Sequence, residues 1–102
     1  MEISRHVIIG RKIKDRAPGI IRNLGSNEKE NAFLITTGAS QGSLMYILSL
    51  KESEHDFYQE RGLRVLGIAK SRSEARGIVR RIFEEADRAG ALGDMKRFLE
   101  EY

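Results

Sequence analysis

The strand-like segments of this chain carry apolar side chains on both of their alternating faces. One face of the run 43–50 carries Leu44, Tyr46, Leu48 and Leu50, and the other carries Met45 and Ile47. The same pattern recurs in residues 32–37 and in residues 6–9. Because successive side chains of a strand point to opposite faces, a sheet built from these strands needs an apolar cover on each face.

An amphipathic helix between Ser71 and Gly90 can supply one of these covers. Ser71 and Glu74 match the capping box, in which each side chain satisfies a free backbone donor at the helix start. The apolar residues that follow recur at spacings of three and four and form one stripe: Ala75, Ile78, Val79, Ile82, Phe83 and Ala86. We also expect a short final helix over residues 95–101, capped by Asp94.

The remaining segments indicate strands and turns. Apolar, β-branched runs predict strands at residues 6–9, 19–24, 32–37, 43–50 and 63–69. Pro18-Gly19 is a turn signal, residues 25–31 read as a loop, and residues 38–42 as a hairpin connection. Residues 51–62 fit either a helical turn or a plain loop. The pattern predicts one α+β domain over residues 1–102, with a mostly antiparallel sheet of four to five strands followed by the two helices.

Two C-terminal helices can cover only one face of such a sheet. We therefore expect the second face to be covered by a second copy of the chain, giving a homodimer. A closed or strongly curled barrel is the alternative.

Composition excludes several kinds of chemistry. The chain has no cysteine, which rules out a disulfide framework, a thiolate metal site, an iron–sulfur cluster and a cysteine nucleophile. The net charge of +3 arises entirely within residues 1–31, which carry seven basic and four acidic side chains. This basic segment fits contact with phosphates or an acidic partner, or a sheet edge protected from unwanted pairing.

Eight cations are the candidate contacts for an anion or a nucleic acid. Five lie in the N-terminal third and three fall four residues apart on the predicted helix: Arg5, Arg11, Lys12, Lys14, Arg16, Arg72, Arg76 and Arg80. Local pairing with neighbouring carboxylates is the simpler interpretation of the helix arginines.

Other candidate features each have a plain structural interpretation beside the functional one. Residues 38–43 resemble a phosphate loop only superficially, because no lysine and no helix follow the second glycine. His55 lies among carboxylates, yet no second histidine stands at a ligand spacing. Gly77 inside the helix indicates either close approach of another backbone or simple tolerance. Phe57 and Tyr58 either close the core or form a binding surface.

No segment predicts a membrane span, and the apolar run at residues 7–9 is too short for a signal peptide. We expect a cytoplasmic protein with no membrane partner, no catalytic residue, no cofactor and no bound metal. The favoured function is a small, non-catalytic interaction or ligand-binding module that self-associates. The alternatives are weak, sequence-independent nucleic-acid binding and, less favoured, a small hydrolase or metal-dependent enzyme centred on His55.

Overall fold

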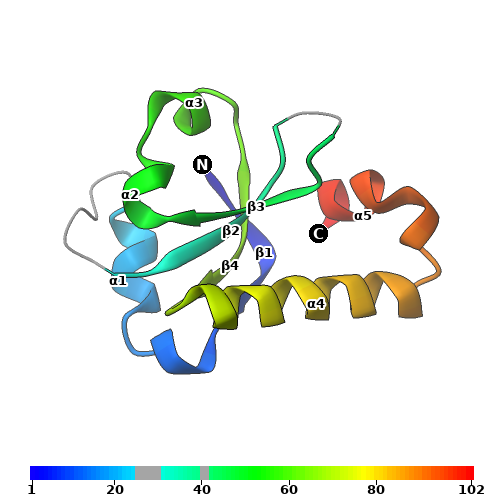
Figure 1. Cartoon of the computed structure of the whole chain (residues 1–102), viewed down its shortest axis with the longest axis horizontal. Helices are drawn as coiled ribbons and strands as arrows, with labels where there is room; N and C mark the ends of the chain where they lie inside the picture. Colours follow the sequence, from blue (N-terminus) through cyan, green and yellow to red (C-terminus); the bar gives the residue numbers. More distant parts are fainter. Residues whose placement is uncertain (25–30, 40–41) are drawn as a thin grey trace.

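The computed structural model describes residues 1–24, 31–39 and 42–102. The strands are β1 (Glu2–Ile9), β2 (Phe33–Thr37), β3 (Met45–Ser49) and β4 (Arg64–Ala69). The helices are α1 (Ala17–Arg22), α2 (Leu50–Ser53), α3 (Asp56–Gln59), α4 (Arg72–Arg88) and α5 (Met95–Glu101), with short 3₁₀ helices η1 (Arg11–Ile13) and η2 (Leu92–Asp94). Figure 1 shows their arrangement. The loop predicted at 25–31 and part of the 38–42 connection lie outside the described residues.

The four strands form one sheet in the order β1-β4-β2-β3. The predicted hairpin is confirmed, since β2 pairs antiparallel with β3, and β2 also pairs antiparallel with β4. The strand β1 runs parallel to β4, so the sheet is mixed. The α+β prediction is confirmed, with one parallel pairing at an edge.

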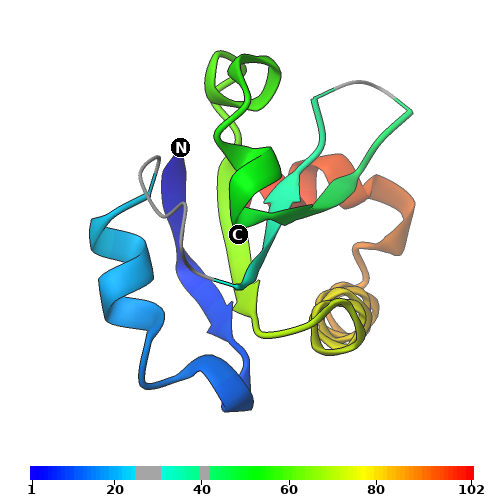
Figure 2. The ribbon, with the colours of Figure 1, turned by 60° about the vertical axis from the view of Figure 1, so that its left-hand side comes forward.

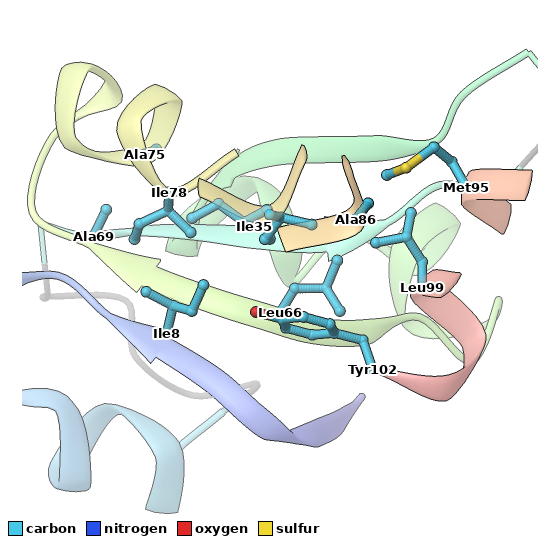
Figure 3. Packing of buried hydrophobic residues seen from close by; sticks show 11 residues of the cluster. Ile8, Ile35, Leu66, Ala69, Ala75, Ile78, Ala86, Met95, Leu99 and Tyr102 are labelled. Carbon is cyan, nitrogen blue, oxygen red and sulfur yellow. The ribbon is translucent and has the colours of Figure 1, made fainter. Parts of the chain in front are cut away.

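The predicted cover by the C-terminal helices is confirmed on one face of the sheet. Ala75, Ile78, Ile82 and Ala86 of α4 are buried against Ile8, Ile35 and Leu66 of the strands, and Met95 and Leu99 of α5 complete this cluster (Figure 3). Ser71 caps α4 by accepting the N–H of Glu74, and Asp94 caps α5 by accepting the N–H of Arg97. The sequence therefore specified this layer through periodicity and caps together.

The opposite face is covered by residues that were predicted to form a strand. Residues 19–24 do not form one, because 17–22 fold into α1 with Pro18 in the first turn. Proline is tolerated there because the first N–H groups of a helix have no intrahelical partner. The side chains of Ile13 and Ile20 are buried against Leu34, Val65 and Ile68. Figure 2 shows α1 and α4 on opposite sides of the sheet.

Both faces of the sheet are thus covered within one chain. Leu50, the first residue of α2, is buried in the same cluster as α1. The expectation of a homodimer or a barrel rested on an uncovered face, and that premise is wrong. Self-association itself is not tested by this finding. Within the described residues, no helix is long and apolar enough to cross a membrane.

Candidate functional site

A groove runs between the edge strand β1 and helix α4. Its larger part has a volume of about 740 Å³ and is lined by His6, Val7, Ile8, Ile9, Lys14, Arg81, Glu85, Phe98, Glu101 and Tyr102. A smaller part, of about 290 Å³, shares Ile8, Ile9, Lys14 and Arg81 with it and extends to Gly10, Arg11, Glu74 and Gly77. We call the whole feature the β1–α4 groove. A volume of this order is typical of a small-molecule site.

Three cations from two elements gather at one end of the groove. Arg11 and Lys14 belong to the η1 segment and its immediate continuation, and Arg81 projects from α4. Arg11 and Lys14 are exposed, and within the part of the chain that the structure describes their side chains have no hydrogen-bonded or ion-paired partner. Arg81 pairs with Glu85 at 3.4 Å, which leaves several guanidinium donors available.

The carboxylates that border the groove are each engaged. Glu74 accepts the backbone N–H of Lys70 at 2.8 Å and that of Lys12 at 3.2 Å. Glu85 accepts the hydroxyl of Tyr102 as well as Arg81, and Glu101 pairs with Arg97 at 3.4 Å. The acidic groups are thus occupied, whereas Arg11 and Lys14 have no partner in residues 1–24, 31–39 and 42–102. This asymmetry favours an anion at the Arg11–Lys14 end.

The other end of the groove is built around Tyr102. Its ring lies edge-on to His6 with the centroids 5.7 Å apart and also contacts Phe98. The hydroxyl of Ser4 donates to the backbone oxygen of Tyr102 at 2.6 Å. Ser4 lies in the irregular part of β1, between the paired residues Ile3 and Ile8, whose partners Val65 and Gly67 in β4 are separated by Leu66 alone. Burial, followed by the hydrogen bond to Glu85, raises the pKa of the Tyr102 phenol above its ordinary value of 10.0.

Gly77 lies on the α4 wall of the groove. Of the two interpretations of this glycine, close approach of another backbone is not supported, because a Cβ at Gly77 would meet nothing within 4 Å among the described atoms. Glycine inside a helix costs roughly 0.5–1 kcal/mol relative to alanine. Gly77 therefore leaves open space in the groove, and contacts with neighbouring described atoms do not explain why a glycine stands at this position.

The structure separates the eight candidate cations. Only Arg11 and Lys14 line the groove, while Lys12 of η1 is exposed and contributes its backbone N–H to Glu74. Arg16 donates to the carbonyl oxygen of Asn31. Arg72 pairs with Glu52 at 3.5 Å and lies over the ring of Phe33.

The remaining candidates, Arg5 on β1 and Arg76 and Arg80 on α4, are exposed and line none of the hollows described above. Arg81 follows Arg80 by one residue and so points about 100° away around the helix. The predicted basic line of α4 therefore does not face the groove, and Arg81, which does, was not among the candidates.

His55 and its aromatic neighbours lie at the short helix α3. The Nδ1 atom of His55 accepts the N–H of Phe57 and caps α3. Among the described residues, no group of three or more His, Asp or Glu side chains could hold a metal ion.

Tyr58 is half-buried with its ring 5.6 Å from that of Tyr46, whereas Phe57 is 42 % exposed. The segment considered as a phosphate loop, residues 38–43, lies partly outside the described residues, at 40–41. The strand β3 follows this segment, whereas a phosphate loop is followed by a helix.

Searches with this chain against protein-family models, the curated proteins and the solved structures each found no match. The geometry of the β1–α4 groove is therefore the basis on which a function can be assigned.

Proposed function

We propose that the protein is a small, non-catalytic ligand-binding module that holds an anionic small molecule in the β1–α4 groove. The observation that carries the proposal is a pair of cations, Arg11 and Lys14, that have no partner among the described residues. They lie at the end of the groove where the neighbouring carboxylate of Glu74 is already bonded to two backbone N–H groups. An anion at this position would accept hydrogen bonds from Arg11 and Lys14, whose side-chain donors have no partner in the described part of the chain.

Gly77 supports the same location. A helix-interior glycine beside the cations keeps the wall bare where any longer side chain would project into the smaller part of the groove. On this proposal, the glycine lowers the stability of α4 but leaves room in the groove for the ligand.

Nucleic-acid binding is the alternative, and the structure gives it less support than the sequence did. The candidate cations are split between the groove, the far side of α4 and local contacts such as those of Arg72 with Glu52 and Phe33. A continuous polyanion would need one basic surface, and its affinity would fall steeply with salt.

Self-association is a separate part of the proposal. The sheet face through which self-association was expected is covered by α1. The two edge strands β1 and β3 remain the surfaces through which copies of the chain can pair.

Calorimetric titration tests the groove, with pyrophosphate and succinate as separate probes for phosphate and carboxylate recognition. The variant Arg11→Ala/Lys14→Ala should weaken binding of the preferred probe at least about tenfold, since each hydrogen bond to a charged group contributes roughly 1.5–3 kcal/mol. The matched control is Arg76→Ala/Arg80→Ala, which removes the same charge from the exposed face of α4 and should leave binding unchanged. Equal losses in both variants would mean non-specific attraction, and no binding of either probe would refute the proposal.

A further inference from the structure

The outer edge of β3 carries backbone groups with no partner in the described part of the chain. Gly38 donates to Leu44, and Leu50 donates to Ala32, which fixes the hydrogen-bonding pairs between β2 and β3. Since these pairs alternate along an antiparallel ladder, the N–H and C=O groups of Met45, Ile47 and Ser49 point away from β2. The strand β3 is the last of the sheet on this side.

One of these outward groups is already occupied. The N–H of Ser49 donates to Glu52 at 3.0 Å, and the Ser49 hydroxyl accepts the Glu52 N–H in a complete capping box for α2. The hydrogen bond from the Ser49 N–H is the largest cause of a lowered pKa at Glu52, so this carboxylate stays charged and bonded at neutral pH. The unpaired part of the edge is therefore short and centred on Tyr46, with Met45 and Ile47 on either side.

The two edges of the sheet differ in how they are protected. The edge strand β1 carries Glu2 and Arg5 and is irregular between Ile3 and Ile8, and charges and bulges are the usual devices that discourage pairing. The strand β3 has neither a charged residue nor a proline. An unprotected, apolar edge is a pairing site for another strand.

Apolar side chains flank the free edge on both faces of the sheet. Met45 and Ile47 are partly exposed on the α4 side, and Tyr46 contacts Tyr58 on the other. Nearby, Leu44 is 40 % exposed and Phe57 is 42 % exposed. These side chains would lose further contact with water against a second strand.

We propose that β3 pairs antiparallel with β3 of a second copy about a two-fold axis at Tyr46. In this register the free groups of Met45 meet those of Ile47 of the second copy, and the bonded Ser49 N–H is not needed. The register also places Leu44 opposite Leu48 of the second copy. A second copy is the favoured occupant because the free segment is self-complementary about its centre. The inference rests on the self-association in the proposed function and is independent of the groove.

Charge exchange at the axis provides the test. Tyr46→Lys and Tyr46→Glu each place like charges directly opposite one another, so each variant alone should sediment as a monomer at concentrations where the unaltered chain is a dimer. An equimolar mixture should recover the dimer, because Lys then faces Glu. Arg5→Glu on the other edge is the matched control and should leave the dimer intact.

Hydrogen exchange on the unaltered chain gives a reading that does not depend on either variant folding. The amides of Met45 and Ile47 should become protected as the concentration rises, while the amide of Ser49 is protected throughout. A dimer that survives both charge variants, or a dimer in which these two amides stay unprotected, would refute the β3 edge while keeping self-association. A monomer at all concentrations would refute self-association together with the edge, and it would leave the groove proposal standing.

Discussion

The carboxylate of Glu74 lies where a side chain at Gly10 would have to be. A Cβ at position 10 would overlap Glu74 Oε1, while the two oxygens of that carboxylate accept the N–H groups of Lys70 and Lys12. Glu74 was expected to complete a capping box at Ser71, but its carboxylate instead ties the start of α4 to the segment that follows β1. This tie holds one end of the β1–α4 groove together.

The first prediction concerns this tie. Glu74→Ala should lower the free energy of unfolding by about 1–3 kcal/mol, because it removes two hydrogen bonds from backbone N–H groups to a charged carboxylate. Gly10→Ala should be similarly costly in the unaltered chain, since it displaces the carboxylate, but should cost much less in the Glu74→Ala background. Chemical denaturation of the two single variants and the double variant measures this coupling. Additive losses would show that the two residues do not act through one another.

The second prediction contrasts two glycines. Gly77→Ala should stabilise the chain by up to about 1 kcal/mol, since alanine favours the helix and its Cβ would meet no described atom within 4 Å. Gly67→Ala in β4 should destabilise it, because a Cβ there would lie 2.8 Å from Ile78 Cγ2 and 3.1 Å from the carbonyl oxygen of Ile8. Thermal denaturation of both variants decides the signs. A destabilising Gly77→Ala would remove the argument that this glycine is kept for the groove.

A larger residue at position 77 tests the groove itself. Gly77→Gln should fold at least as stably as the unaltered chain but bind the anionic probe more weakly, because its side chain would extend into the smaller part of the groove. Calorimetric titration alongside Gly77→Ala separates the two effects. Unchanged affinity in Gly77→Gln would place the ligand elsewhere.

The third prediction concerns the core. Ile82 is fully buried in α4, so Ile82→Ala should cost roughly 2–5 kcal/mol. Arg80→Ala, two residues earlier on the exposed face, should change stability by no more than about 0.5 kcal/mol. Urea denaturation of the two variants provides the comparison. A loss below about half a kcal/mol at Ile82 would mean that α4 is docked differently.

The fourth prediction is a dependence on alkaline pH. Burial and the hydrogen bond to Glu85 raise the pKa of Tyr102 in the folded chain above its value in the unfolded chain. The stability from the neutral phenol is therefore fully present below about pH 10 and is lost as the pH rises further. Between about pH 9 and about pH 11 the unaltered chain should lose more unfolding free energy than Tyr102→Phe. Parallel losses in the two proteins would contradict this assignment.

Sequence patterns predicted the strands β2, β3 and β4, the second half of β1 and the C-terminal helices, because each of these has a strong local signal. The caps Ser71 and Asp94 and the stripe through Ile82 lie within single segments. The prediction was wrong at 19–24, where Pro18-Gly19 was interpreted as a turn. The spacing of Ala17, Ile20, Ile21 and Leu24 is helical, and proline in a first helical turn is a recognised start signal. That signal would have identified the second cover of the sheet and removed the argument for an uncovered face.

The groove could not be predicted in the same way. Its cations come from Arg11, Lys14 and Arg81, which only the parallel pairing of β1 with β4 and the docking of α4 bring together. Gly77 was the one local clue, because a helix-interior glycine marks a position with a special requirement. Tyr102 and Glu85 carry no sequence signal that would link them.

An NMR titration of the uniformly ¹⁵N-labelled chain with pyrophosphate or succinate, whichever binds in calorimetry, locates the anion site residue by residue. With the anion in the β1–α4 groove, the largest amide shifts should occur at Ile9, in residues 11–14 and at Gly77 and Arg81, and the Arg11→Ala/Lys14→Ala variant should lose them. Shifts centred on Arg76 and Arg80, on β3 or on the segment around His55, or no shifts at a saturating probe concentration, would contradict the groove as the binding site.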